Sequence, residues 1–332
     1  MAQTIYVNTA NGTSGDGTTN ETDSSPDSAF KTLQEAEADL PATFTEDITI
    51  MCEGATDDTS AVTFTGYDVS TFTLTVIGDY SGFGWNDSEY ILSTTDGGEL
   101  QVSTDLILKN IQCINGGTNN TRWALQVNTL SAGDFFRAEN CIFRITGTGG
   151  TGSYCVNCSD PAAVDEQIFV NCVFVNDLHD ALITGGAVDG GTVLYNCTLY
   201  GNGGNGIRND SQQALLKNCL SYNNTESDYS GGGAATGSVT NLSEDTTATT
   251  YSDSGGVNSA TITFEDTANY DFRLVAGDTD AIGAATDLSG DSVFAFNTDA
   301  AGNTRSSWDI GAHEFQGGGA IHPIMHHIRQ QE

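Results

Sequence analysis

The sequence predicts an all-β solenoid in which one short unit of strands repeats along the chain. A step of asparagine followed by an apolar residue recurs inside short apolar runs, and its six copies are Asn110-Ile111, Asn140-Cys141, Asn171-Cys172, Asn196-Cys197, Asn218-Cys219 and Asn241-Leu242. Successive asparagines are 30, 31, 25, 22 and 23 residues apart. A repeat of this length is typical of proteins in which each copy buries its apolar face against the next copy.

Each copy has the pattern of a strand, a one-residue corner and a second strand. The run 168–174 is rich in β-branched and aromatic residues, is broken only by Asn171, and is too short for a helix. Asparagine tolerates the left-handed backbone conformation that a sharp corner requires, and its amide can bond to the asparagine of the next coil. We therefore expect an asparagine ladder beside a column of buried cysteines, which comprises Cys141, Cys172, Cys197 and Cys219.

This pattern, over about residues 45–250, resembles the right-handed parallel β-helix of the pectate lyase-like superfamily. The resemblance implies an all-β, right-handed parallel β-helix solenoid with a short N-terminal capping helix and a C-terminal closing segment plus tail. We accordingly divide the chain into residues 1–44 (N-terminal strand and capping helix), 45–258 (parallel β-helix), 259–316 (closing segment) and 317–332 (a flexible, glycine-hinged arm).

The N-terminal region has the signals of a strand followed by a helix. Residues 4–8 have the composition of a strand, and the helix is expected to start near Ser25, which can cap it, with Pro26 in the first turn. Phe30, Leu33 and Ala36 then line one face at helical spacing. In β-helix proteins with a similar opening, this helix covers the first coil, whose core and strand edge are otherwise exposed.

The closing segment carries a second resemblance. Its order of Asp280-Ala281-Ile282-Gly283, then Arg305, then residues 309–314, is similar to the end of secreted and phage-borne β-helix proteins, where its role is structural. We expect an internal ion pair between Arg305 and either Asp309 or Glu314.

Composition restricts the classes of partner. The 44 acidic residues outnumber 10 basic ones and give a formal charge of −34, so the surface repels nucleic acids and anionic polysaccharides. Residues 1–7 carry no secretory signal pattern, and no apolar run reaches the length of a membrane span. The cysteine column indicates reduced thiols, and the Cys155/Cys158 pair lacks the second pair that a zinc site requires. We therefore expect neither nucleic-acid nor membrane partners.

The tail departs from the solenoid pattern. Gly317-Gly318-Gly319 predicts a flexible joint. An apolar and histidine-rich arm follows, and it can be a docking arm, a disordered end or a metal site made by His322, His326 and His327. The residues predicted to contact a docking partner are Ile321, His322, Pro323, Ile324, Met325 and Ile328.

Candidate chemistry is sparse. The lyases of the resembling superfamily use calcium and an arginine or lysine base, whereas its hydrolases use Gly-His-Gly and Arg-Ile-Lys tripeptides, which this sequence lacks. The catalytic candidates are Asp177, His179 and Asp180, which place two carboxylates and an imidazole on one loop. Asp16 and Asp23 are candidate calcium ligands, and no other cofactor is expected.

Two functions follow. The first is a non-catalytic virion structural protein, such as a phage capsid decoration, fibre or tail appendage, made in the host cytoplasm. It would attach to other virion proteins or to its own subunits through the arm, as a homo-oligomer for which the family suggests a trimer. The alternative is an extracellular carbohydrate-active enzyme or glycan-binding β-helix of polysaccharide lyase or glycoside hydrolase type, with host-surface glycans among its ligands. Carboxylates and aromatic residues along one face would favour the alternative, and the sequence leaves open whether Trp85, Trp123 or any tyrosine lies there.

Overall fold

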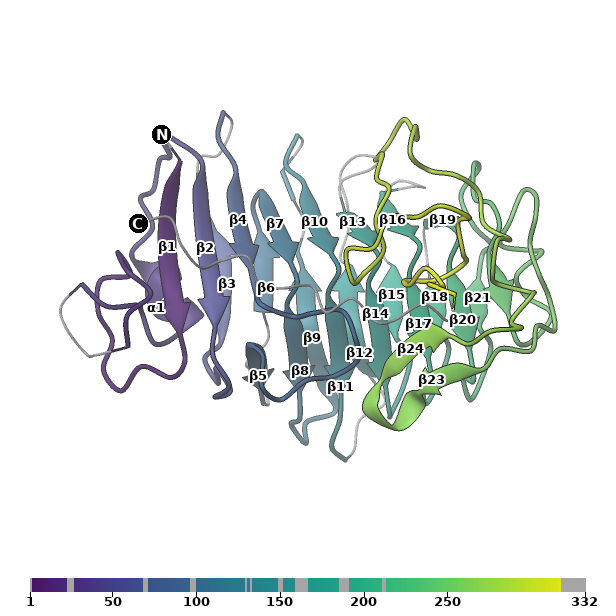
Figure 1. Cartoon of the computed structure of the whole chain (residues 1–332), viewed down its shortest axis with the longest axis horizontal. Helices are drawn as coiled ribbons and strands as arrows, with labels where there is room; N and C mark the ends of the chain where they lie inside the picture. The colour runs from purple at the N-terminus through teal and green to yellow at the C-terminus, as the bar shows by residue number, and fades with distance from the viewer. Residues whose placement is uncertain are drawn as a thin grey trace.

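The chain winds into three parallel β-sheets that run the length of an elongated solenoid (Figure 1). The computed structural model describes residues 2–22, 27–67, 71–95, 100–128, 130–131, 133–148, 152–158, 167–184, 191–210 and 213–317. Consecutive coils return to each sheet in order, and such crossovers between parallel strands are right-handed. The predicted right-handed parallel β-helix is therefore confirmed.

The strands of each sheet are short and stack in register. The first sheet contains β1 (Gln3–Asn8), β2 (Ile48–Glu53), β4 (Leu74–Ile77), β7 (Leu106–Lys109), β10 (Phe136–Glu139), β13 (Gln167–Val170), β16 (Thr192–Tyr195) and β19 (Leu215–Lys217). The second sheet contains β5 (Ile91–Thr94), β8 (Gln112–Asn115), β11 (Ile142–Ile145), β14 (Val173–Asn176), β17 (Thr198–Tyr200), β20 (Leu220–Tyr222) and β22 (Leu242–Ser243). The third sheet contains β3 (Val62–Thr65), β6 (Leu100–Ser103), β9 (Thr121–Val127), β12 (Gly152–Cys158), β15 (Leu182–Thr184), β18 (Ile207–Asn209) and β21 (Tyr229–Gly231).

The asparagine corners join the first sheet to the second, as predicted. Asn110, Asn140, Asn171, Asn196 and Asn218 have φ angles between 49° and 58°, in the left-handed region that asparagine tolerates better than most residues. Nδ2 of Asn140 donates to Oδ1 of Asn110 at 3.2 Å, Nδ2 of Asn171 to Asn140 at 3.1 Å, and Nδ2 of Asn218 to Asn196 at 3.0 Å. The ladder is confirmed, with one break between Asn171 and Asn196.

The predicted corner at Asn241 is wrong by one residue. Thr240 takes the left-handed conformation, with φ of 52°, while Asn241 is buried in the position that cysteine occupies in the preceding coils. Oδ1 of Asn241 accepts from the amide of Cys219 at 3.0 Å, and Nδ2 donates to the carbonyl of Tyr251 at 2.7 Å. The asparagine moves inward because the last coil offers these polar partners to its amide.

The cysteine column lies inside the solenoid. All eight cysteines are buried and free, and Cys141, Cys172, Cys197 and Cys219 each direct Sγ at a first-sheet carbonyl of the preceding coil, at 3.3–3.7 Å. Burial raises the pKa of Cys172 and Cys197. These thiols therefore act as small core side chains.

The N-terminal cap forms as predicted, but its helix starts later. Helix α1 (Leu33–Ala38) is capped by Thr32, whose hydroxyl accepts from the amide of Glu35, while Glu35 accepts from the amide of Thr32. This reciprocal capping fixes the start at Leu33 rather than near Ser25, and Ser25 and Pro26 lie outside the described residues. Leu33 and Ala36 are buried in the core as predicted, whereas Phe30 lies before the helix and forms a β-bridge with Val7. The described helices include none that is long and apolar enough to span a membrane.

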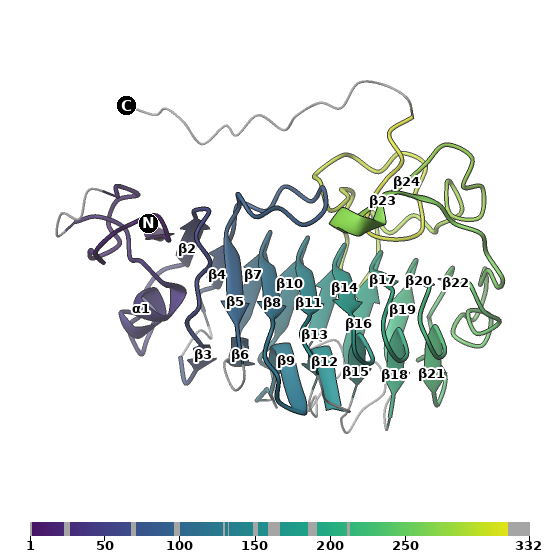
Figure 2. The same ribbon diagram turned by 90° about the horizontal axis from the view of Figure 1, so that it is seen from below.

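The closing segment (residues 259–316) returns along the side of the solenoid. It includes β23 (Phe264–Asp266), the short 3-10 helix η1 (Thr267–Asn269) and β24 (Asp271–Leu274), and it packs on the outer faces of the first and second sheets (Figure 2). The open end of the core is instead covered by Ala248 and Tyr251, and the Tyr251 ring stacks on Tyr229. The segment thus covers two sheet faces rather than the last coil.

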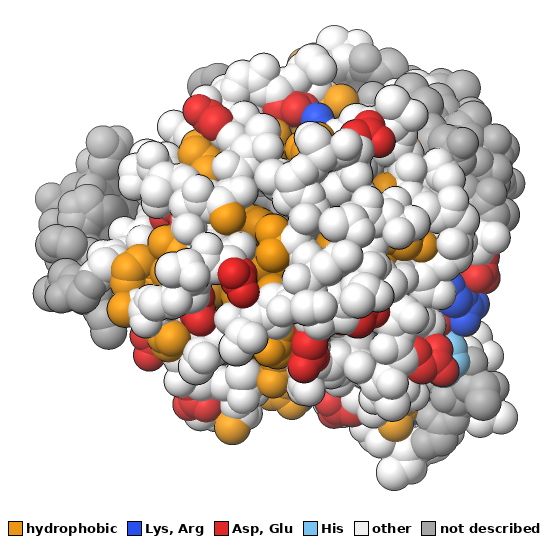
Figure 3. Space-filling model, turned by 90° about the vertical axis from the view of Figure 1, so that its right-hand side faces the viewer, with side chains coloured by type: hydrophobic (Ala, Val, Ile, Leu, Met, Phe, Trp, Pro, Cys, Tyr) orange, Lys and Arg blue, Asp and Glu red, His pale blue; other side chains and the backbone are white. Residues whose placement is uncertain are grey.

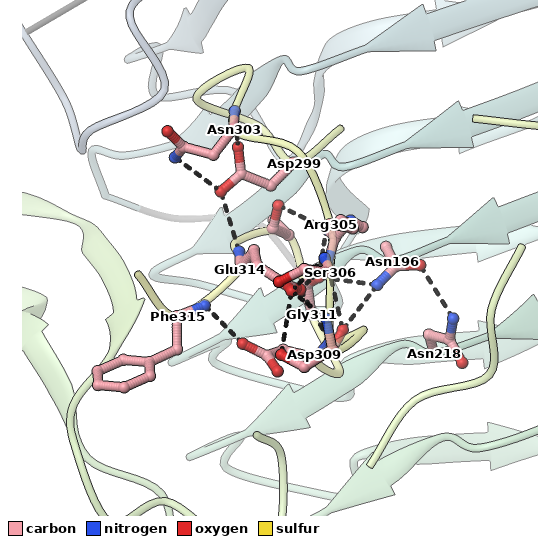
Figure 4. Close-up of polar contacts among 12 residues, drawn as sticks. Asn196, Asn218, Asp299, Asn303, Arg305, Ser306, Asp309, Gly311, Glu314 and Phe315 are labelled. Carbon is pink, nitrogen blue, oxygen red and sulfur yellow. Dashed lines mark hydrogen bonds and ion pairs between the residues drawn. The ribbon is translucent and has the colours of Figure 1, made fainter. Parts of the chain in front are cut away.

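Two internal contacts hold the closing segment in place. The loop 78–90, between β4 and β5, reaches over to it, because the amide of Trp85 donates to the carbonyl of Asn269 at 2.9 Å and Nε2 of His313 lies 2.6 Å from the carbonyl oxygen of Gly82. Arg305 enters the break in the asparagine ladder and donates to Oδ1 of Asn171 at 2.9 Å (Figure 4).

The predicted ion pair of Arg305 forms with Glu314. The Nη1 atom of Arg305 lies 3.6 Å from Oε2 of Glu314, and both side chains are buried. Asp309 instead accepts from the amides of Gly283 and Phe315, and only its backbone carbonyl contacts Arg305. Burial lowers the pKa of Arg305 to about 10, so the guanidinium stays charged at neutral pH.

Candidate functional site

The structure brings two of the three catalytic candidates, His179 and Asp180, together and leaves Asp177 apart. Asp180 is fully buried: its Oδ1 accepts from the amide and side chain of Asn205 at 2.7 and 2.8 Å, and its Oδ2 lies 2.8 Å from Nη1 of Arg208. A carboxylate engaged in this way holds the loop together and cannot reach a ligand. Asp180 lies on the predicted loop, but its burial keeps it from acting as one of two carboxylates that face a ligand.

His179 is the member of this trio whose surroundings permit chemistry. Its Nδ1 lies 3.2 Å from Oδ2 of Asp180, its side chain is 26% exposed, and its ring meets Tyr154 edge-on at 5.6 Å. An imidazole oriented by a carboxylate through one nitrogen can exchange a proton or a hydrogen bond through the other.

Asp177 lies at the surface apart from this pair. Partial desolvation raises the pKa of its carboxyl, and the nearby Arg144 guanidinium opposes the shift. Among the described residues, no hydrogen bond or ion pair joins the side chain of Asp177 to His179 or Asp180.

The outer face of the third sheet is the sheet face that the closing segment leaves uncovered. Among the described residues, the two apolar clusters that the segment forms contain strand residues of the first and second sheets and none of the third. Figure 2 shows the segment on one side of the solenoid and β9, β12, β15, β18 and β21 on the opposite side. One outward row of this face, in register from coil to coil, comprises Thr63, Gln101, Gln126, Asn157, Ile183, Arg208 and Ser230.

Aromatic and basic side chains gather at one edge of this face. Trp123 on β9 and Tyr154 on β12 are paired in register on adjacent coils, and both side chains are half-buried. Arg208 lies over the Tyr154 ring at 5.3 Å, and its Nη2 donates to the Tyr154 hydroxyl at 3.0 Å. With His179, these residues form a strip over four successive coils, which we call the aromatic strip (Trp123, Tyr154, His179 and Arg208).

The charge of Arg208 is neutralised within the protein. Burial favours the neutral form, but the carboxylates of Asp210, at 2.8 Å, and Asp180 outweigh it and raise the pKa of Arg208. Glu226 adds an exposed carboxylate, whose Oε2 accepts from Nδ2 of Asn205 at 2.9 Å. The aromatic strip is therefore bordered by negative charge.

Sequence reasoning missed Tyr154 and Arg208, although coil spacing carries the signal. Trp123 and Tyr154 are 31 residues apart (154 − 123), the same distance that separates Asn140 from Asn171, so they occupy equivalent positions on adjacent coils. Trp85, in contrast, lies under the closing segment, where its ring contacts Arg144 at 4.4 Å.

The predicted metal ligands find little support. Asp16 is exposed and its carboxylate accepts from the amide and hydroxyl of Thr18, which is the hydrogen bonding of a turn. Asp23, like the arm residues 321–328 with their three histidines, lies outside the described residues. Within the described ranges, no group of three or more histidine, cysteine or acidic side chains is arranged to hold a metal ion.

Comparisons with known proteins assign no family to this chain. No protein-family model matches the sequence, and neither does any curated protein. Among solved structures, the chain is similar to one described as the crystal structure of pectate lyase Pel9A, with 13% identity and a TM-score of 0.45 over 94% of this chain and 96% of that chain. The assignment as a parallel β-helix depends on the three sheets of this chain itself.

Proposed function

We propose that this protein is a glycan-binding β-helix that holds a carbohydrate chain across the outer face of its third sheet. The observation that carries the proposal is the aromatic strip, which the closing segment leaves uncovered and which extends over four successive coils. Aromatic rings pack against the apolar faces of sugar rings, and side-chain amides such as Gln126 and Asn157 can bond to sugar hydroxyls.

The solenoid suits an extended ligand. Neighbouring strands lie about 4.7–4.9 Å apart, so equivalent side chains on adjacent coils repeat at nearly the length of one sugar unit. Trp123, Tyr154 and Arg208 are held on strands, and a site on a rigid scaffold loses little freedom on binding.

The geometry favours binding over cleavage. Hydrolysis requires two carboxyl groups that both face the sugar, and the carboxylate next to His179, that of Asp180, is buried and bonded to Arg208 and Asn205. Proton abstraction by an arginine or lysine requires an available base, and Arg208 is paired with two carboxylates. His179 keeps acid–base capacity, which an assay for new reducing ends or unsaturated products tests directly.

Calorimetric titration with oligosaccharides tests the proposal. Replacing Trp123 or Tyr154 by alanine should weaken binding about tenfold or more, because central aromatic contacts each contribute on the order of 1.4–2 kcal/mol. Phe294→Ala is the matched control, since Phe294 is also half-buried and lies 4.6 Å from an arginine, Arg137, but sits in the closing segment. If Tyr154→Ala and Phe294→Ala weaken oligosaccharide binding equally, the third sheet is not the binding face.

A virion role remains a separate prediction. Attachment to virion proteins or to a second subunit, and a trimeric state, depend on arm residues outside the described part of the chain. Light scattering of the full chain, compared with a chain ending at Phe315, measures whether the arm drives assembly. A glycan-binding face is compatible with an adhesive role on a particle.

A further inference from the structure

We infer that the glycan recognised at the aromatic strip carries amino groups and lacks carboxylate and sulfate groups. This inference depends on the proposed glycan-binding function and specifies the chemical class of its ligand. It follows from where the positive charges of the protein lie and from what surrounds the strip.

The basic side chains of the solenoid and closing segment are engaged internally. Arg122 and Arg144 are buried, with 1% and 8% exposure, and Lys31 belongs to the N-terminal cap. The remaining described basic residues form the pairs Lys109–Glu139 (3.1 Å), Arg137–Glu139 (2.6 Å), Arg208–Asp180 (2.8 Å), Lys217–Asp291 (2.5 Å), Arg273–Asp271 (2.5 Å) and Arg305–Glu314 (3.6 Å). An anionic sugar would have to break one of these pairs to gain a partner.

The aromatic strip itself has an excess of acid. Arg208 faces both Asp180 and Asp210, while Asp177 and Glu226 lie on the loops that lead into β15 and β21. The field at this face therefore repels a uronate or sulfated chain and attracts an ammonium group.

The wider surface has the same sign. Figure 3, which views the C-terminal end of the solenoid, shows acidic side chains spread over the face and few basic ones. The ring of Trp123 adds a local preference, because an ammonium group over an aromatic face is attracted by the ring electrons, as the Arg208 guanidinium over Tyr154 illustrates. Rings and carboxylates together fit an amino sugar better than a neutral one.

Three oligosaccharides of equal length test this inference on the full chain: oligomers of glucosamine, of N-acetylglucosamine and of galacturonic acid. By calorimetry at physiological ionic strength, the glucosamine oligomer should bind at least tenfold more tightly than the N-acetylated one, and the galacturonate oligomer should not bind. Asp177→Asn combined with Glu226→Gln should reduce glucosamine binding several-fold and leave N-acetylglucosamine binding unchanged.

The control separates this local effect from general attraction to an acidic protein. Asp287→Asn removes an equally exposed carboxylate from the closing segment, on the other side of the solenoid, and should leave binding unchanged. An equal loss in Asp287→Asn, or galacturonate binding as tight as glucosamine binding, would overturn the inference. If only the N-acetylated oligomer binds, and Tyr154→Ala abolishes its binding, the proposed function stands and the inference about amino groups fails. If none of the three oligomers binds, both are contradicted.

Discussion

Replacing Arg305 by methionine should loosen the closing segment from the solenoid. Arg305 is fully buried and donates to the carbonyls of Gly311 and Ala312 at 3.1 and 2.9 Å and to Oδ1 of Asn171 at 2.9 Å. It also neutralises Glu314. Methionine has a similar length but no donors, so these acceptors and the Glu314 carboxylate would remain buried without their partner.

The magnitude follows from the cost of breaking a buried pair. Removing one member of such a pair lowers the free energy of unfolding by about 3–5 kcal/mol, because the remaining charge stays buried. This loss is a large part of the roughly 5–15 kcal/mol that stabilises a typical folded domain. The individual hydrogen bonds, at about 1 kcal/mol each, are included in that figure and are not additive with it.

Urea denaturation and hydrogen exchange measure the effect. Arg305→Met should lower the free energy of unfolding by the stated amount, and exchange should rise first in residues 259–316. Lys109→Met is the matched control: Lys109 forms an ion pair with Glu139 at 34% side-chain exposure, and its loss should cost less than about 1 kcal/mol. A loss in Arg305→Met no larger than in Lys109→Met, or exchange that rises equally along the whole chain, would refute the reasoning.

Three further predictions concern stability and core chemistry. Thermal stability should be greatest in mild acid. Burial raises the pKa of Asp228 to about 6, so the folded state gains stability by taking up this proton as pH falls from 7. Burial would raise the pKa of Glu314, but three backbone amides and Arg305 outweigh it and lower this pKa in the folded state. The ionised Glu314 therefore stabilises the fold at a pH above its pKa in the unfolded chain, and this stabilisation is lost as pH falls through its pKa in the folded protein. Glu314→Gln should flatten the acid limb of a plot of melting temperature against pH. Thr240→Asn should raise the free energy of unfolding by about 1 kcal/mol, because asparagine suits a φ of 52° and its amide can donate to Asn218 as the threonine hydroxyl does. A lower melting temperature for this variant would contradict the prediction. All eight cysteines should resist thiol labelling until denaturant is added, as a mass spectrum with and without urea shows.

The coils could be predicted from the sequence because their signals are local and repeated. A sharp corner needs a residue that accepts positive φ, and asparagine supplies it at the five positions from Asn110 to Asn218. The same logic failed at Asn241, where Thr240 is the corner. There the buried amide gains partners in the last coil that the repeat pattern does not encode.

The candidate site could be predicted only in part. The loop of His179 was found because its residue types are those of acid–base chemistry, and the structure does place His179 at the uncovered face. The burial of Asp180 depends on Asn205 and Arg208, which come from the next coil, 25 and 28 residues further on. No local pattern around residue 180 indicates that partnership.

The sequence by itself determined the coil, the ladder and the buried thiols, since each depends on residues within one repeat and its neighbour. The tertiary structure alone decided which of the three sheets remains uncovered. That choice depends on contacts between distant segments, such as Gly82 with His313 and Asn171 with Arg305, which bring the closing segment onto the first and second sheets. The closing segment leaves the third sheet, with Tyr154 and Arg208, uncovered because it is anchored on the other two sheets.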